Sequence, residues 1–199
     1  MYPLFESIKV VDGEFINLKF HQQRVDQSRK ELLGDSSRLV LDDLLQVPLQ
    51  FTKGIVKCRM SYGRTLGSVD FSSYQRGTIS SIRLIRCPRF DYHLKYEDRS
   101  EINRIYQMKG TCDEVLIACD GYITDTSYSN VALFDGLEWV TPANPLLKGT
   151  QRAKLIASGL TKEKEVAISD LKQYKKLVLV NAMLEFDPTH SISIECIEW

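Results

Sequence analysis

Three Asp-Gly dipeptides, at residues 12–13, 120–121 and 135–136, each stand between two short stretches rich in apolar and β-branched residues. Asp-Gly readily adopts the positive φ angles of a tight hairpin turn, so each dipeptide predicts two antiparallel strands joined directly. Such hairpins are incompatible with a sheet in which every strand is followed by a crossover helix. The sequence therefore predicts a mixed α/β fold with antiparallel hairpins and argues against a doubly wound nucleotide-binding sheet.

The spacing of apolar residues predicts further strands and several helices. Helices are predicted at residues 20–33, 41–45, 100–108 and 150–158. Strands are predicted at 4–10, 14–18, 54–61, 67–75 and 79–86, and then at 114–119, 122–126, 131–134, 138–140, 165–168, 177–181 and 192–197. A linker is predicted at 87–91, because Pro88 disfavours helix in the residue before it. The expected domains are a smaller N-terminal α/β lobe at 1–87 and a C-terminal α/β lobe at 88–199.

The charged residues are balanced, since Lys plus Arg and Asp plus Glu number 26 each. A chain without net charge has no broad field to attract nucleic acid or an anionic membrane, so we expect a small-molecule partner. The first residues do not predict a secretory signal, and the sequence shows no run of about 18 apolar residues. Five scattered cysteines and three distant histidines predict neither disulfides nor a metal site. Together these features predict a soluble protein of the reducing cytoplasm.

Four short motifs occur in an order that matches a known family. They are Phe5-Glu6-Ser7-Ile8-Lys9, His21-Gln22-Gln23-Arg24, Lys95-Tyr96-Glu97-Asp98-Arg99, and Asp113-Glu114 followed by Asp120-Gly121. In this order they resemble the class IV aminotransferases, the fold type IV family of pyridoxal 5'-phosphate (PLP) enzymes. That family includes aminodeoxychorismate lyase, branched-chain aminotransferases and D-amino-acid aminotransferases. The resemblance implies a two-lobed fold like that of the D-amino-acid aminotransferases, PLP as the cofactor, and a homodimer.

Lys95 is the candidate catalytic residue. Taken alone it would be a solvated surface lysine, because lysine side chains are seldom buried. The chemistry needs a primary amine that condenses with the cofactor aldehyde and later exchanges with the substrate amine, and only lysine supplies one. The resemblance makes Lys95 that residue, and it also implies that the released amine serves as general base and acid.

Three residues are candidates for the cofactor phosphate. The resemblance assigns Arg24, whose planar guanidinium suits an anion, although without it Arg24 would be one more arginine on the polar face of a helix. Thr150 and Gln151 open a predicted helix, where backbone N–H groups attract phosphate. Here Gly149-Thr150-Gln151-Arg152 replaces the family's Gly-Ile-Thr-Arg, so a hydroxyl at the threonine position is missing. The alternative for this stretch is an ordinary helix cap.

Asp125 occupies the place of a glutamate in the family pattern acid-x-Ser-x-Ser-Asn. The resemblance implies that this carboxylate keeps the pyridine nitrogen of PLP protonated, so that the ring can accept electrons. Aspartate is one methylene shorter than glutamate, so the backbone must come closer or a water must bridge. Ser129 and Asn130 complete the predicted cofactor site, and the alternative for all three residues is a structural role in a turn.

Three residues are candidates for substrate binding. Asn181, in Asn181-Ala182-Met183, resembles the Asn-Ala-Leu-Met stretch of aminodeoxychorismate lyases, although an asparagine after a strand is also a common turn former. Arg59 and Arg64 lie where the family has arginines for a substrate carboxylate, and both could equally be solvated charges on an edge strand.

The first functional hypothesis is a lyase that converts 4-amino-4-deoxychorismate to 4-aminobenzoate and pyruvate in folate biosynthesis. The alternative is a class IV aminotransferase acting on a small amino acid and a 2-oxo acid, which needs the same lysine. A third hypothesis is a catalytically silent PLP-binding protein, to which the departures at Asp125 and Gln151 point.

Overall fold

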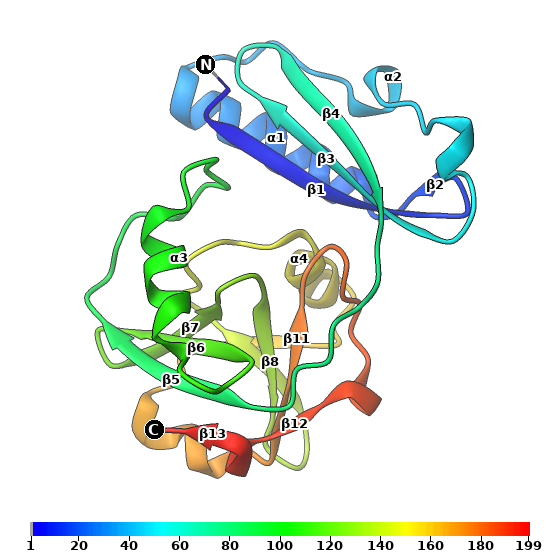
Figure 1. The fold of residues 1–199 in the computed structure, drawn as a ribbon. Coiled ribbons are helices and arrows are strands. Elements are labelled where there is room, and N and C mark those ends of the chain that lie inside the picture. Colours follow the sequence, from blue (N-terminus) through cyan, green and yellow to red (C-terminus); the bar gives the residue numbers. More distant parts are fainter. Residues whose placement is uncertain (1) are drawn as a thin grey trace. The chain divides into compact units, whose positions relative to one another are not determined.

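The computed structural model describes residues 2–199 and separates the chain into two compact units. Unit 1 runs to Arg76 and also takes in Leu94–Asp98, whereas unit 2 comprises Gly77–His93 and Arg99–Trp199. Each unit combines a sheet with helices, so the predicted mixed α/β class is confirmed (Figure 1). None of the helices in residues 2–199 combines the length and the apolar composition needed to cross a bilayer.

Unit 1 is built on a four-stranded sheet with the strand order β2-β1-β3-β4. Its strands are β1 (Leu4–Val11), β2 (Glu14–Phe15), β3 (Ile55–Tyr62) and β4 (Leu66–Ser73), and each neighbouring pair is antiparallel. Asp12 and Gly13, with φ angles of 48° and 90°, turn β1 into β2. The first predicted hairpin is therefore confirmed, because this dipeptide tolerates positive φ.

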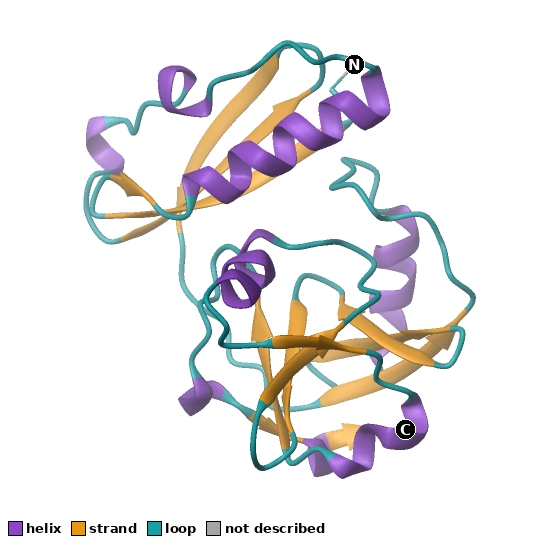
Figure 2. Cartoon of the chain, turned by 180° about the vertical axis from the view of Figure 1, so that it is seen from behind, coloured by secondary structure: helices purple, strands orange, loops and turns teal. Residues whose placement is uncertain are grey.

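The long helix α1 (Leu18–Leu33) lies along one face of this sheet (Figure 2). It ends at Gly34, whose φ of 61° is left-handed and whose N–H bonds to the carbonyls of Arg29 and Lys30. Two shorter helical segments follow, α2 (Leu41–Leu44) and the 3-10 turn η1 (Leu49–Phe51). The buried core of unit 1 comprises Leu4, Ile8, Val10, Val25, Leu41, Leu45, Val56, Cys58, Met60, Tyr62 and Leu94.

The segment Leu94–Asp98 joins unit 1 through backbone contacts with the start of β1. The N–H of Phe5 donates to the carbonyl of Lys95 at 3.0 Å, and the N–H of Glu97 donates to the carbonyl of Pro3 at 2.8 Å. Leu94 is in the core of the same unit. Lys95 is therefore held by unit 1, although it falls within the C-terminal lobe expected at 88–199.

Unit 2 contains a larger mixed sheet. Along the main path its strands are β10 (Lys162–Lys164), β9 (Trp139–Pro142), β8 (Asn130–Phe134), β7 (Tyr122–Thr126), β6 (Glu114–Cys119), β5 (Ile82–Cys87) and β13 (Ile197–Glu198). Strand β11 (Lys176–Val180) pairs with β8 and with β12 (Ile192–Ser193). The helices are α3 (Ser100–Tyr106) and α4 (Thr150–Ala157), with 3-10 turns η2 (Gln107–Lys109), η3 (Ile168–Gln173), η4 (Pro188–His190) and η5 (Ile194–Cys196).

The other two predicted hairpins are confirmed in unit 2. Cys119 pairs with Tyr122 across the turn between β6 and β7, and Leu133 pairs with Val140 across the turn between β8 and β9. The strand predicted at 165–168 is wrong. Only Ala167 of that stretch forms an isolated bridge, and the regular strand is the exposed edge strand β10 just before it.

The place of the strand predicted at 79–86 is also corrected. It fell within the N-terminal lobe expected at 1–87, but β5 lies parallel to β6 in unit 2, with Ile82 opposite Glu114. Its buried residues Ile82, Leu84 and Ile85 pack beside a strand that is buried along its whole length. Parallel neighbours need a long connection, which here contains α3. The units thus divide the chain elsewhere than at the expected boundary between 87 and 88.

Candidate active site

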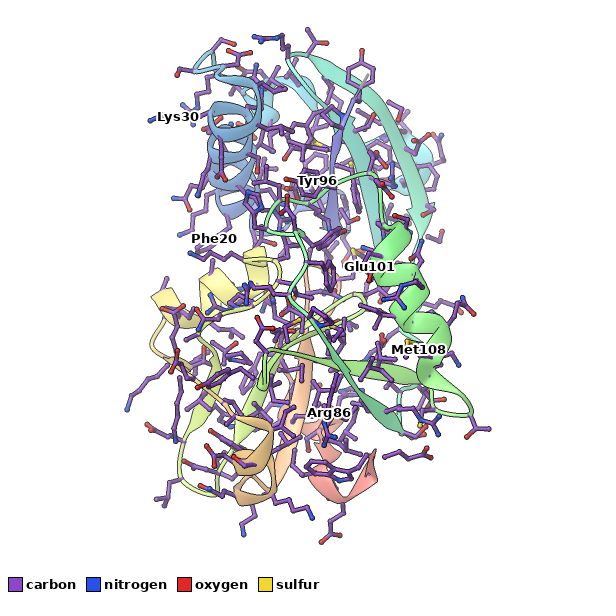
Figure 3. The ribbon with its side chains drawn as sticks, turned by 90° about the vertical axis from the view of Figure 1, so that its left-hand side faces the viewer. Phe20, Lys30, Arg86, Tyr96, Glu101 and Met108 are labelled. Carbon is purple, nitrogen blue, oxygen red and sulfur yellow. The ribbon has the colours of Figure 1, made fainter. Side chains whose placement is uncertain are left out.

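Lys95 of unit 1 lies beside an aromatic ring at the start of β1. Its Nζ is 4.5 Å from the centroid of the Phe5 ring, a distance typical of a cation–π contact. The side chain is half-buried, and its backbone is fixed by the bond from Phe5. Figure 3 labels the neighbouring Tyr96 in this segment, which forms an antiparallel bridge with Leu4. The main chain therefore fixes the backbone of Lys95 beside the start of β1, and its amine lies over the Phe5 ring.

A buried network of charged side chains links β1 to α1 in the same unit. Glu6 lies in phase with Leu4, Ile8 and Val10 on the core face of β1 and is fully buried. Arg24 donates to both of its carboxylate oxygens, from Nε at 2.7 Å and from Nη2 at 2.5 Å. His21, one helical turn before Arg24, places Nδ1 2.7 Å from Oε2 of Glu6. The predicted phosphate ligand Arg24 is thus oriented by Glu6.

The charges in this network are set by burial and by pairing. Burial alone would raise the pKa of Glu6, but the charge of Arg24 and the hydrogen bond from His21 outweigh it and lower the pKa to about 2. Burial lowers the pKa of His21 despite the opposing effect of Glu6, and the nearby charges of Arg24 and Lys95 act in the same direction as burial. Glu6 is therefore ionised and His21 neutral at neutral pH.

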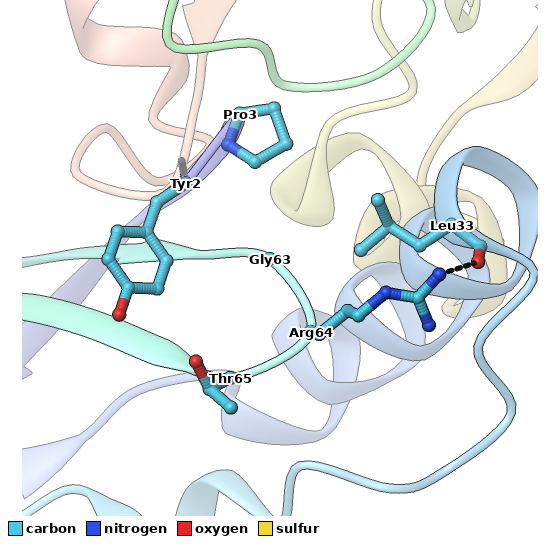
Figure 4. A pocket seen from close by; sticks show the side chains of 6 residues that line it. All are labelled: Tyr2, Pro3, Leu33, Gly63, Arg64 and Thr65. Carbon is cyan, nitrogen blue, oxygen red and sulfur yellow. Dashed lines mark hydrogen bonds between the residues drawn. The ribbon is translucent and has the colours of Figure 1, made fainter.

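Arg59 and Arg64, the candidate carboxylate ligands, lie in different surroundings of unit 1. Nη2 of Arg59 is 2.5 Å from Oε2 of Glu97, and its Cζ is 4.5 Å from the centroid of Phe5. Arg64 is exposed and donates to the carbonyl of Leu33 at 3.1 Å. Figure 4 shows Arg64 among the residues that line a pocket, together with Tyr2, Pro3, Leu33, Gly63 and Thr65. Arg59 therefore contacts the same Phe5 ring as Lys95, whereas Arg64 contacts Leu33.

Asp125 of unit 2 is buried at the end of β7 and is held by two donors. Nδ2 of Asn130 donates to Oδ1 at 2.7 Å, and the N–H of Leu147 donates to Oδ2 at 2.9 Å. Burial raises the pKa of Asp125 to about 6, although both hydrogen bonds and the charge of Arg152 oppose the shift. No lysine or arginine in residues 2–199 forms an ion pair with this carboxylate. An adjacent cation would therefore stabilise its ionised form strongly.

The start of α4 adjoins the same group of side chains. A Cβ on Gly149 would lie 2.0 Å from Oδ1 of Asn130, so only glycine fits at this position. Thr150 and Gln151 form the first turn and are buried, and Gly149 cannot cap the helix with a side chain. Arg152 in that turn is buried too, and its Nε lacks an acceptor in the described part of the chain. The first turn of α4 thus concentrates N–H donors.

Asn181 and Ser129 form a third cluster in unit 2. Nδ2 of Asn181 donates to Oγ of Ser129 at 2.9 Å, while its Oδ1 accepts from the N–H groups of Met183 and Leu184 at 2.8 and 2.9 Å. These bonds shape the turn that follows β11. Asn181 therefore stabilises a turn, which was the alternative considered for it, and its role in substrate binding stays a prediction.

The structure thus arranges the predicted site residues in two sets. Unit 1 gathers Lys95, Arg24 and Arg59 around β1, and Arg64 lies apart from them beside Leu33. Unit 2 joins Asp125 to Asn130 and Asn181 to Ser129, with Thr150 and Gln151 following Gly149.

Sequence reasoning did not assign a role in the site to Glu6, His21, Phe5 or Glu97. Glu6 could have been found from its position, because it falls in phase with the apolar residues of a strand. A charged side chain on the buried face of a strand requires a buried partner. No group of three His, Cys, Asp or Glu side chains within residues 2–199 is placed to hold a metal ion.

Comparison with known proteins adds independent information. Residues 93–192, which contain Lys95, Asp125 and α4, match the family model for amino-transferase class IV. An uncharacterized protein of Haemophilus influenzae is 34% identical over 185 residues, which are 92% of this chain and 98% of that protein.

Two solved structures share the fold. One, from Haemophilus somnus 129pt, is provisionally assigned as a 4-amino-4-deoxychorismate lyase, with 31% identity, a TM-score of 0.86, and coverage of 94% of this chain and 98% of that chain. The other is a hypothetical aminotransferase from Mycobacterium tuberculosis in its PLP-bound form, with 17% identity, a TM-score of 0.71, and coverage of 98% of this chain and 81% of that chain. The chain described here belongs to the class IV aminotransferase family, whose members depend on PLP, and it has the fold of the type IV transaminases.

Proposed function

We propose that the chain is a PLP-dependent lyase that converts 4-amino-4-deoxychorismate to 4-aminobenzoate and pyruvate, the reaction that supplies 4-aminobenzoate for folate. The lyase is preferred to an aminotransferase because of the 31% identity with the Haemophilus somnus protein over nearly all of both chains. The observation that carries the PLP assignment is the buried Asp125 carboxylate, which has hydrogen-bond donors but no ion-pair partner among the described residues.

The side chains of unit 2 fit the ring and the phosphate of PLP. A protonated pyridine nitrogen is a cationic donor, which would offset the cost of ionising Asp125 in a buried place. The α4 start offers an anion the dipole of a helix N-terminus and the backbone N–H groups of Thr150 and Gln151. Because Gly149 has no Cβ, Oδ1 of Asn130 can lie close to it while Nδ2 of Asn130 donates to Asp125.

The side chains of unit 1 fit the reactive end of the cofactor. The amine of Lys95 would bind the aldehyde carbon, and Arg24, held by Glu6, would add a guanidinium for the phosphate. PLP, when bound, supplies an electron sink for the negative charge that develops at the substrate carbon bearing the amine. The Lys95 amine would remove the proton from that carbon. Cleavage of the substrate's C–O bond to its enolpyruvyl group, with a proton returned to that group, would then release pyruvate and leave the substrate ring aromatic.

The substrate carries two carboxylates, and Arg59, Arg64 and Asn181 are the proposed groups that bind it. Among these, Arg59 has the best support, because it shares the Phe5 ring with Lys95. An arginine is well suited to this task, since its planar fork can donate two parallel hydrogen bonds to one carboxylate.

The first experiment tests the cofactor assignment. We expect purified protein mixed with PLP to show the absorption band of lysine-bound PLP, and Lys95→Ala to lose that band. Lys53→Ala, which changes an exposed lysine of the same unit, is the matched control and should keep it. An unchanged band in Lys95→Ala would refute the role of Lys95.

The second experiment separates the two reactions. Pyruvate formed from 4-amino-4-deoxychorismate is expected for the lyase, whereas glutamate formed from an amino acid and 2-oxoglutarate would identify an aminotransferase instead. Product in neither assay, with PLP bound through Lys95, would contradict the lyase and favour the silent PLP-binding protein.

A further inference from the structure

The pair between Arg59 and Glu97 differs from the other arginine–glutamate pair of unit 1. Only Nη2 of Arg59 contacts Glu97, at 2.5 Å from Oε2, and the side chains of Arg59 and Glu97 are 37% and 30% exposed. The Arg24–Glu6 pair uses two nitrogens, and Glu6 is fully buried. A half-exposed pair with a single contact contributes little free energy, because solvent screens it and both side chains lose freedom. The Arg59–Glu97 pair is therefore easily replaced.

The choice of Glu97 as the partner of Arg59 is specific. Asp70 on β4 stands directly opposite Arg59 on β3, the position from which a cross-strand ion pair usually forms. Asp70 nevertheless forms no ion pair with Arg59, whose guanidinium is directed toward Phe5 and Glu97. Neither Nε nor Nη1 of Arg59 has a hydrogen-bond partner within residues 2–199. Arg59 thus retains the donors for a second, bidentate carboxylate contact.

The position of Arg59 relative to Lys95 makes the pair relevant to the reaction. Cζ of Arg59 and Nζ of Lys95 are each 4.5 Å from the centroid of Phe5. The two cationic groups are therefore no farther apart than twice that distance, which a small molecule with an amine and a carboxylate can span. Glu97 follows Lys95 by two residues, and its N–H bond to Pro3 fixes its backbone in the same segment.

We propose that Glu97 is an internal competitor for the substrate carboxylate. In the ligand-free chain its carboxylate occupies Arg59 through one oxygen, and an incoming carboxylate displaces it by making a bidentate contact. Glu97 thereby sets the affinity for amine-bearing carboxylic acids and disfavours weakly held anions. This inference rests on the proposed function in assigning the substrate carboxylate to Arg59, and it goes beyond that function in giving Glu97 a role in specificity.

The test measures binding of a simple carboxylate, benzoate, to the full chain without relying on catalysis. Isothermal titration calorimetry, with and without PLP, measures the benzoate affinity of every variant. In the wild type and in Glu97→Gln, the NMR Nε–Hε signal of Arg59, identified by its absence in Arg59→Gln, reports that benzoate reaches this arginine. We expect Glu97→Gln to tighten benzoate binding about two- to fivefold, the range that a half-exposed ion pair allows. Arg59→Gln and the double variant should both lose this binding.

Asp70→Asn is the matched control, because it removes one negative charge from the residue opposite Arg59 without breaking an ion pair. Its benzoate affinity should equal that of the wild type. Equal tightening in Asp70→Asn and Glu97→Gln would overturn the proposal, since the effect would then be general electrostatics. No tightening in Glu97→Gln would also overturn it. Arg59→Lys, which keeps the charge but lacks the fork, should bind benzoate more weakly and covers the case in which Arg59→Gln does not fold.

The outcomes also distinguish this inference from the proposed function. Pyruvate production with a Michaelis constant and a benzoate affinity unchanged by Glu97→Gln would leave the lyase standing and remove the role of Glu97. Tighter benzoate binding in Glu97→Gln, in a protein without lyase activity, would support the competitor and contradict the lyase.

Discussion

Two buried carboxylates, Glu6 and Asp125, have pKa values shifted in opposite directions. Glu6 has the guanidinium of Arg24 on both oxygens, and its pKa falls to about 2. Asp125 has only neutral donors in direct contact, and burial raises its pKa to about 6. The difference between them is the presence of a paired cation, which outweighs desolvation for Glu6. Glu6 is thus a satisfied structural charge, whereas Asp125 has capacity for a cationic ligand.

The raised pKa of Asp125 predicts a pH dependence of stability. An unfolded aspartate has a pKa of about 3.9, so between that value and about 6 the folded chain binds more protons than the unfolded chain. The free energy of unfolding should therefore fall as the pH rises through this window, by up to about 3 kcal/mol from this residue. Asp125→Asn lacks this contribution. Urea unfolding of both proteins without PLP should show the variant gaining relative stability from pH 4 to pH 7 by about that amount.

A difference between wild type and Asp125→Asn that stays constant with pH would contradict the assignment. The hydrogen bonds that asparagine disturbs do not titrate, so their cost is the same at each pH. Added PLP should reduce the pH dependence, because a protonated ring nitrogen beside Asp125 lowers its pKa.

Glu6 gives the opposite prediction. Glu6→Gln leaves Arg24 and His21 in place around a neutral amide, and removing one partner of a buried ion pair costs about 3–5 kcal/mol. In the wild type, the stabilisation from Glu6 is present above the unfolded pKa of about 4.3 and is lost as the pH falls toward about 2. Urea unfolding at neutral pH measures the loss.

Glu101→Gln provides the comparison for Glu6→Gln. Glu101 on α3 pairs with Arg104 at 2.5 Å, but the side chains are 44% and 60% exposed. The loss of stability there should be much smaller than in Glu6→Gln, because solvent screens such an exposed pair. Similar losses in the two variants would show that Glu6 is not the buried centre described here.

At the scale of elements, the start of α4 depends on one close approach. Gly149 has an ordinary φ of −69°, so its need for glycine comes entirely from Asn130, whose Oδ1 would lie 2.0 Å from an added Cβ. Asn130 on β8 in turn bonds Asp125 on β7 and the carbonyl of Leu147. Two strands and a helix are therefore connected through one side-chain amide.

Gly149→Ala should displace Asn130 and weaken this connection. We expect a loss of about 1–3 kcal/mol in the free energy of unfolding, as for other overpacked sites, together with weaker PLP binding. Gly77→Ala is the control, because an added Cβ there has no neighbour within 4 Å, and it should change both quantities little. PLP titration and urea unfolding provide the two measurements. Wild-type behaviour of Gly149→Ala in both would mean that Asn130 moves aside without consequence.

At the scale of the whole molecule, the chain passes between its units three times, at 76–77, 93–94 and 98–99. The short segment Leu94–Asp98 is held in unit 1 by main-chain bonds to β1, although it is flanked on both sides by unit 2. Lys95 thus lies in a segment with both ends anchored, which limits the motion of its backbone. Such a placement suits a residue whose amine must reach a defined atom.

The family relationship also predicts the assembly. We expect a homodimer in solution, with twice the mass of one chain, as the resemblance to class IV aminotransferases implies. Sedimentation equilibrium over a range of micromolar concentrations measures this mass. A chain that stays monomeric at every concentration, with or without PLP, would contradict the expectation.

The sequence by itself determined the hairpins at the three Asp-Gly turns, the end of α1 at Gly34, and the order of motifs that identifies the family. These features depend on turn chemistry and apolar spacing over a few neighbouring residues, so they can be read locally. The side chains of Lys95, Asp125 and Arg24 could be nominated in the same way, by their places in short motifs.

Only the tertiary structure decided which distant residues meet. It placed β5 beside β6, fixed Leu94–Asp98 on β1, and paired Glu6 with His21 and Arg24. It also directed the fully buried Arg29 to the carbonyls of Gly63 and Arg64, at 2.9 and 2.7 Å, which no local pattern predicts. The physical reason is that a buried charge must find partners wherever the packed elements supply them, and the choice depends on the whole fold rather than on neighbours in sequence.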